Sequence, residues 1–250
     1  MHNKLSSIVF LFALTVVSFS PSRAAEPEIY ILSTSTDAPY VNDSGTGFQD
    51  LVIQEMFNRI GLKARVESYD ASSRALTNAN IGIDHGVSMR IKGLNKKFTN
   101  LVRIEEPLIS NEFVAYSRDL HIVTDSWVSL ENHLVGYIHG WQIFQNNMTE
   151  GTQKNSVKTA EQMFRMLDLG RIDIALYERW QGLELARKSN MKVLVHEPPL
   201  ATVDMYPFMH KDYAHLVPKL TQALRDMKAD GGYQKIYETS FGYLQQEHHD

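Results

Sequence analysis

The 250-residue chain contains no cysteine. Disulfides, thiol catalysis and thiolate metal sites are therefore excluded, and a packed apolar core has to stabilise the fold. Long apolar runs are also scarce, because no segment after the first two dozen residues is apolar enough to span a membrane. These absences favour a chain that folds in water around its own core.

The chain also lacks a long run of lysine or arginine, and its formal net charge is −4. A mildly acidic protein of this kind is a poor candidate for binding nucleic acid or an anionic membrane surface. We therefore expect no nucleic acid among its partners.

Catalytic sequence motifs are absent too. No GxSxG, HExxH or phosphate-loop motif occurs, and the histidines are scattered along the chain. Since an enzyme needs a nucleophile, a base or a metal ion, we expect no catalytic activity, no cofactor and no metal site.

Residues 1–24 have the features of a signal peptide. A weakly basic start that includes Lys4 precedes the apolar run IVFLFALTVV, and small residues follow. Ser22 and Ala24 fit the small-residue positions before a cut, so we predict cleavage after Ala24 and export to the periplasm. An uncleaved membrane anchor is the alternative. The remaining 226 residues (250 − 24) are enough for one or two lobes.

Segments with strand character alternate with segments of helical spacing. The strand-like EIYILSTS precedes FQDLVIQEMFNRIGL, whose apolar residues recur at helical spacing and end at Gly61. The alternation begins again after residue 118, and we expect helices over WQIFQNNM and AEQMFRMLDLG, then one long and one short C-terminal helix. This pattern predicts βαβ units, largely parallel sheets and an α/β fold.

Two successive α/β series predict two lobes. We expect lobe 1 to contain residues 25–117 and 200–250, and lobe 2 to contain residues 118–199. Strand-like segments near 113–118 and 203–209 are the expected crossings between the lobes. A ligand in such a fold lies at the carboxyl ends of the strands, in the cleft between the lobes.

An ordered series of short motifs spans nearly all of residues 25–250: DAPY, GFQDLVIQEMFNRIGLKARVE, GVSMRIKGLNKKF, LVGYIHGWQIF, LDLGRIDIALYE and ADGGYQKIY. In order and spacing this series resembles the bacterial family 3 extracellular solute-binding proteins. The resemblance implies the two-lobed type 2 periplasmic-binding-protein fold. It also implies a monomer that closes around an amino acid or small carboxylic acid and serves an ABC permease.

The resemblance further implies ligand-binding residues in the first lobe. Tyr40 matches an aromatic residue that covers the ligand, although an aromatic side chain at a turn can equally pack on the lobe. Gly86 and Ser88 match a small turn whose backbone and hydroxyl hold a ligand carboxylate.

In the second lobe the same resemblance implies a site at a helix start. Gly140, Trp141 and Gln142 match the beginning of a helix whose free N–H groups can receive an anion. Glu178 matches an acidic position that pairs with a ligand ammonium group. The alternative for Glu178 is to cap the helix that starts near Arg179.

Arg90 is the cation that we expect to contact the ligand. A guanidinium offers paired donors that match a carboxylate, and lysine cannot reproduce this geometry. The alternative is a surface salt bridge with one of the nearby acidic residues, Glu105, Glu106 or Asp84.

The spacing around Arg90 departs from the family pattern. Arg90 comes only two residues after Ser88, and a gap-free count from Phe98 puts Lys92 or Gly93 at the position of the family's arginine. Either Arg90 or Lys92 is therefore the predicted ligand contact, and the identity of the ligand is left open.

Two other functions can use the same fold. One is a periplasmic sensory or regulatory protein that feeds no transporter. The other is a small-acid dehydratase or lyase with Glu178 or a cleft histidine as its base, and His85 and His139 lie at predicted strand ends. A structural role is the alternative for both histidines.

Overall fold

The computed structural model of the protein describes residues 29–246. The predicted signal peptide, residues 1–24, and the predicted cleavage after Ala24 lie outside the described residues. Within residues 29–246, no helix is both long enough and apolar enough to cross a membrane.

The first part of the described chain alternates strands with helices, as the hydrophobic spacing predicts. Phe48, Val52 and Met56 are fully buried on one face of the first helix, and Gly61 follows its end with a φ of 76°. The elements are β1 (Tyr30–Thr34), α1 (Phe48–Asn58), β2 (Ala64–Ser68), α2 (Ser72–Asn80), β3 (Gly86–Ile91), η1 (Leu94–Lys96), β4 (Leu101–Arg103) and β5 (Ile109–Ser117).

A second series follows β5, and the chain then returns toward the first. Two long helices end the described chain, so the expectation of a short last helix is wrong: α7 has 15 residues. The elements are η2 (Trp127–Leu130), β6 (Leu134–Ile138), α3 (Gln142–Gln145), β7 (Gln153–Val157), α4 (Ala160–Asp168), β8 (Ile174–Glu178), α5 (Arg179–Lys188), β9 (Leu194–Val195), β10 (Ala201–His210), η3 (Lys211–Leu216), α6 (Val217–Ala229) and α7 (Gly232–Gln246).

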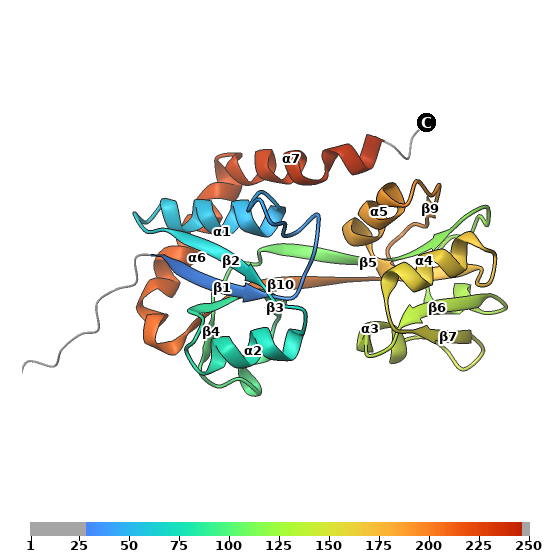
Figure 1. Ribbon diagram of the computed structural model, residues 1–250, viewed down its shortest axis with the longest axis horizontal. Helices are drawn as coiled ribbons and strands as arrows, with labels where there is room; N and C mark the ends of the chain where they lie inside the picture. The colour runs from blue at the N-terminus through green and yellow to red at the C-terminus, as the bar shows by residue number, and fades with distance from the viewer. Residues whose placement is uncertain (1–28, 247–250) are drawn as a thin grey trace, which may run out of the picture.

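The strands form one mixed sheet of ten strands that runs through two lobes, with a parallel part in each lobe (Figure 1). In lobe 1, β1 pairs in parallel with β2 and β3, and in lobe 2, β6 pairs in parallel with β7 and β8. The strand order through both lobes is β2-β1-β3-β10-β5-β8-β6-β7, with helices packed on the sheets. The predicted α/β, two-lobed architecture is confirmed.

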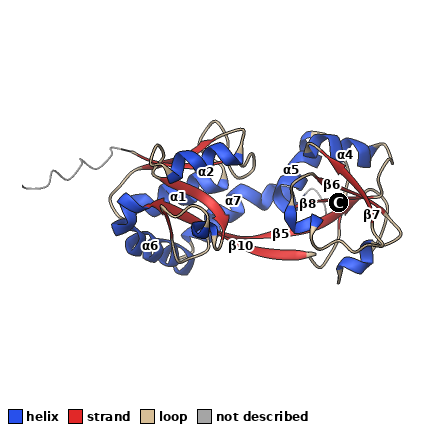
Figure 2. Cartoon of the chain, turned by 90° about the horizontal axis from the view of Figure 1, so that it is seen from below, coloured by secondary structure: helices blue, strands red, loops and turns tan. Residues whose placement is uncertain are grey.

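The long strands β5 and β10 run between the lobes (Figure 2). β5 pairs with β10 from Ile109 to Phe113, and from Phe113 onward it pairs with β8. β10 pairs with β5 up to Met205 and with β3 after it. Both strands are antiparallel to their neighbours and longer than the predicted crossings. The lobe boundaries at residues 117 and 199 stay a prediction.

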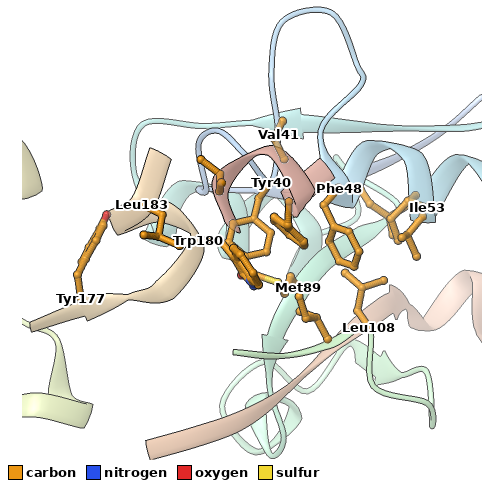
Figure 3. Packing of buried hydrophobic residues seen from close by; sticks show 14 of the residues in the cluster. Tyr40, Val41, Phe48, Ile53, Met89, Leu108, Tyr177, Trp180 and Leu183 are labelled. Carbon is orange, nitrogen blue, oxygen red and sulfur yellow. The ribbon is translucent and has the colours of Figure 1, made fainter. Parts of the chain in front are cut away.

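The hydrophobic core contains an aromatic cluster that both lobes share (Figure 3). Phe241 of α7 is fully buried, with its ring centroid 4.9 Å from that of Phe48 and 5.6 Å from that of Tyr40 in lobe 1. On the other side, Phe241 stacks on Trp180 of α5 at 4.6 Å. The last helix therefore packs on lobe 1, as predicted, and reaches lobe 2 as well.

The helix predicted over WQIFQNNM is much shorter than expected. α3 contains only the four residues from Gln142 to Gln145. Asn147 follows it, and its side-chain Nδ2 donates to the Ile143 carbonyl at 2.8 Å. An asparagine that bonds the local backbone in this way competes with the helical hydrogen bonds, which explains the early end.

Candidate functional site

Arg90 lies near the carboxyl end of β3, beside the chain that leaves β1. Because β1 and β3 are parallel, their carboxyl ends meet at the same edge of the sheet. The Nη1 atom of Arg90 donates to the Met89 carbonyl at 2.8 Å, and Nη2 donates to Ser35 Oγ at 3.1 Å and Ser72 Oγ at 3.2 Å. Arg90 thus joins the end of β1 to the first residue of α2.

The guanidinium of Arg90 has no carboxylate partner among the described residues. The acids considered as salt-bridge partners are engaged elsewhere: Glu105 with Arg103, Glu106 with Arg225 and Lys228, and Asp84 with the Tyr69 hydroxyl. Burial lowers the pKa of Arg90 to about 10, and its Nε atom is buried without a hydrogen-bond partner. The side chain is a desolvated cation that lacks an anion.

Lys92, the alternative to Arg90, lies just beyond the end of β3 and is exposed. Neither its charge nor its position is constrained by burial. Of the two cations, Arg90 is the one that the surrounding fold desolvates and orients.

Gly86 and Ser88 lie inside β3, so the expectation that they form a turn is wrong. Gly86 pairs with Leu32 and Met209, and a Cβ atom there would lie 2.2 Å from the Phe208 carbonyl oxygen. The glycine is required because two strands approach closely at this point.

The Ser88 hydroxyl faces the interior of lobe 1. Ser88 is fully buried, and its Oγ lies 2.6 Å from Gln49 Oε1 and 3.5 Å from the Ser33 carbonyl oxygen. Both neighbours are acceptors in lobe 1, so the single hydroxyl hydrogen of Ser88 is used within its own lobe. Contact between Ser88 and a ligand stays a prediction.

Tyr40 and Glu178 meet across the two lobes. The Tyr40 hydroxyl donates to Glu178 Oε1 at 2.8 Å and lies 3.1 Å from Asn111 Oδ1 on the crossing strand β5. Tyr40 is fully buried and Glu178 is 1% exposed. The packing role that was the alternative for Tyr40 is therefore present in the structure.

Glu178 also caps α5, which was the alternative role for this residue. Its Oε2 atom accepts from the Gln181 N–H at 2.9 Å. Both carboxylate oxygens are thus engaged, and burial raises the pKa of Glu178 to about 7. A direct contact with a ligand ammonium group stays a prediction.

The second-lobe residues divide between the core and the surface. Trp141 is half-buried, stacks on Phe144 at 5.8 Å and lies 4.8 Å from the Tyr177 ring. Gly140 is an exposed turn residue with a φ of 90°, and Gln142 is exposed at the start of α3. A four-residue helix offers little dipole for an anion, and the role expected for its N-terminus stays a prediction.

Two serines that contact Arg90 were missed by the sequence analysis. Ser35 follows β1 and Ser72 begins α2, and both contact Arg90. Tyr177, the last residue but one of β8, lies beside Trp141, and burial, together with the charges of Glu178, Glu161 and Asp37, raises its pKa. The place of Ser35 after a strand and of Ser72 at a helix start was the available signal, but serine is too common at both places to single out.

The two histidines differ in their surroundings. The Nδ1 atom of His85 accepts from the Ile31 N–H at 2.9 Å, and the ring packs against Tyr30 and Tyr213. His85 precedes β3 at the amino end of that strand, far along the strand from Arg90, and has the structural role. His139 is exposed at the carboxyl end of β6. No group of three or more potential metal ligands occurs within residues 29–246.

Comparison with known proteins gave one sequence relative and many structural ones. No family model matches the chain. An uncharacterized protein of Shewanella oneidensis strain MR-1 is 25% identical over 249 residues, covering 94% of this chain and 92% of the relative.

Solved structures match over most of the chain. An ancestral arginine-binding protein bound to glutamine has a TM-score of 0.67 and 21% identity, covering 86% of this chain and 99% of its own. The ligand-binding core of GluR0 from Nostoc punctiforme, in complex with L-glutamate, has a TM-score of 0.66 and 15% identity over 86% and 99% of the two chains. The ABC transporter substrate-binding protein AbpA from Streptococcus pneumoniae, bound to L-arginine, has a TM-score of 0.66 and 13% identity over 87% and 96%. The chain therefore has the two-lobed type 2 periplasmic-binding-protein fold that these amino-acid-binding proteins share.

Proposed function

We propose that this protein captures a small anionic or zwitterionic solute, of about the size of an amino acid, in the cleft between its lobes. The lobes close around the solute by a hinge movement at β5 and β10. The protein is a binding protein that carries out no chemical reaction on the solute.

The observation that carries this proposal is the state of Arg90. A largely buried guanidinium without a counter-ion costs free energy, and the lowered pKa of Arg90 reflects that cost. A bound anion removes the cost and supplies an acceptor near the buried Nε atom. The placement of Arg90 at the carboxyl ends of β1 and β3 supports the same assignment, since ligands of open α/β sheets bind at that edge.

The compared structures support an amino-acid-like solute. Their ligands are glutamine, L-glutamate and L-arginine, all of which carry a carboxylate and an ammonium group. We extend this class to the present chain together with small carboxylic acids. Tyr177 and the charges of Asp37 and Glu161 that act on it provide an electronegative region suited to an ammonium group.

We further propose that the protein works in the periplasm and passes its solute to an ABC permease. The substrate-binding protein from Streptococcus pneumoniae belongs to such a transporter. A membrane sensor is the alternative partner, and a pull-down from membranes that retrieves a sensor protein in place of a permease would favour it.

The proposal is tested by identifying the bound solute. The protein is purified under native conditions and then denatured, and the released small molecules are analysed by mass spectrometry. Thermal shift assays with amino acids and small organic acids follow. We expect a stabilising shift from at least one of them, because a ligand that binds only the folded state stabilises it.

The Arg90→Met variant separates a ligand-binding role from a structural one. It removes the buried charge, so the unliganded variant should unfold at the same temperature as the wild type or a higher one, while solute binding falls by at least about 100-fold. Arg65→Met removes an exposed arginine paired with Glu67 and should leave binding unchanged. Loss of stability with retained binding in Arg90→Met would refute the proposal.

A further inference from the structure

We infer that the anionic group of the solute is a tetrahedral oxyanion, of the phosphate, phosphonate or sulfonate kind, and that Ser35 and Ser72 bind it together with Arg90. The inference rests on the proposed function, because it assigns the chemistry of the same cleft. It distinguishes this chain from a receptor whose arginine holds a planar carboxylate alone.

Most hydrogen-bond donors of the Arg90 guanidinium already bond to groups of the protein. A carboxylate that binds an arginine in the paired manner needs two adjacent N–H groups along one edge of the guanidinium. Here Nη2 donates to both Ser35 Oγ and Ser72 Oγ, which accounts for both of its hydrogens. Each paired edge includes Nη2, so neither is open to a carboxylate while these bonds persist.

The hydroxyls of Ser35 and Ser72 are both bound to Arg90. Each accepts a hydrogen bond from Arg90, and each keeps one hydrogen to donate. Within the described residues neither hydroxyl hydrogen has an assigned acceptor. Ser72 is exposed and Ser35 is half-buried, so both hydroxyls are within reach of a solute. Because each serine oxygen accepts from Arg90, the hydroxyl hydrogen of each serine is left to donate to a solute.

The amino end of α2, which begins at Ser72, lies beside the same guanidinium. The residue before it, Ala71, provides no side-chain cap, and the first turn of this nine-residue helix contains no acidic residue. Its first N–H groups therefore lack the side-chain acceptor that helices commonly have at this end. Together with the buried, unpartnered Nε of Arg90, this end of the helix favours an anion.

The donors outnumber the oxygens of a carboxylate. β3 provides the remaining Nη1 hydrogen of Arg90, and the chain after β1 provides the Ser35 hydroxyl. α2 provides the Ser72 hydroxyl and the N–H groups of its amino end. A carboxylate has two oxygens in one plane, whereas a tetrahedral oxyanion presents three or four oxygens in different directions. Only the tetrahedral group can accept from donors on three elements with a separate oxygen for each.

The test compares solutes that share a skeleton and differ in the anion. β-Alanine, taurine and 2-aminoethylphosphonate are all two-carbon amines that end in a carboxylate, a sulfonate and a phosphonate. Their affinities for the full-length protein are measured by calorimetry, and inorganic phosphate and sulfate are compared with acetate by thermal shift. We expect the phosphonate, the sulfonate or both to bind at least tenfold more tightly than β-alanine, and phosphate or sulfate to stabilise the protein more than acetate.

The serine variants make the test specific. Ser35→Ala and Ser72→Ala should each weaken binding of the preferred tetrahedral solute about tenfold, because each removes a charge-assisted hydrogen bond. The same changes should affect β-alanine much less. Ser73→Ala removes the exposed neighbouring hydroxyl of α2 and serves as the matched control with unchanged affinity.

The outcomes separate this inference from the proposed function. If carboxylates bind as tightly as their tetrahedral counterparts, or if both serine variants bind like the wild type, the inference is overturned and the proposed function stands. If no anion of either kind binds, both are overturned. The relative affinities of phosphonate and sulfonate show which tetrahedral group the cleft prefers.

Discussion

Glu178 shows how a single buried residue can make stability depend on pH. Its carboxylate accepts hydrogen bonds from the Tyr40 hydroxyl and from the Gln181 N–H, and both lower its pKa. Burial acts in the opposite direction and is the larger effect, so the pKa rises from 4.5 to about 7. The folded protein therefore holds a proton on Glu178 that the unfolded chain releases.

This proton predicts a loss of stability as the pH rises. Between pH 4.5 and about 7 the folded state binds more protons at Glu178 than the unfolded state, so the free energy of unfolding falls with increasing pH. Over this range the titration of Glu178 lowers the free energy of unfolding by an amount of the order of 3 kcal/mol. Urea denaturation at pH 5 and pH 8 should show a smaller decrease for Glu178→Gln than for the wild type. The exposed Glu150→Gln should behave like the wild type, and equal pH dependence in all three proteins would contradict this account.

At the scale of elements, α7 connects the lobes on one side of the molecule (Figure 1). It packs on α1 and α6 in lobe 1 and on α5 in lobe 2. Phe241 stands between Phe48 and Trp180, and further along the helix the Tyr243 hydroxyl lies 3.1 Å from Glu184 Oε2. Any change in the angle between the lobes has to adjust these contacts.

Removal of the central ring of this cluster should destabilise the whole fold. Phe241→Ala deletes a fully buried side chain and leaves a cavity, at a cost of about 3–5 kcal/mol in urea denaturation. Tryptophan emission should shift to longer wavelength as Trp180 loses its stacking partner. Leu169→Ala, at a residue that is 53% exposed, should cost less than about 0.5 kcal/mol. A similar cost in both variants would show that α7 contributes little.

At the scale of the molecule, two strands connect the lobes where we propose the hinge. Two antiparallel strands, β5 and β10, pass between the lobes, and their pairing partners change along their length. A pair of extended strands can bend with small changes at several residues, while the parallel part of the sheet in each lobe remains rigid.

Solute binding should therefore compact the protein. If the solute contacts Arg90 in lobe 1 and residues near Tyr177 in lobe 2, small-angle X-ray scattering should show a smaller radius of gyration at saturating solute. Arg90→Met under the same conditions should keep the unliganded value. An unchanged radius of gyration in a wild-type protein that demonstrably binds solute would argue against hinge closure.

Much of the architecture could be predicted from local patterns. The alternation of strand and helix periods identified the βαβ units, because the spacing of apolar residues reports which face of each element is buried. Two local predictions failed. The helix over WQIFQNNM is short because Asn147 bonds the backbone beside α3, and the turn expected at Gly86 is part of a strand because Gly86 pairs with β1. The length of α7 depended on Phe241 and Leu244, which are buried by distant elements.

The candidate site divides in the same way. The sequence determined the two α/β series, the ends of their strands and the place of Arg90 near one of them, because these follow from periodicities within short segments. Only the tertiary structure decided what each side chain does. Tyr40 and Glu178 are 138 positions apart and meet in a buried hydrogen bond, whereas Ser35 and Ser72 come together only through Arg90. Burial and pairing between distant segments are properties of the packed chain, so no local pattern encodes them.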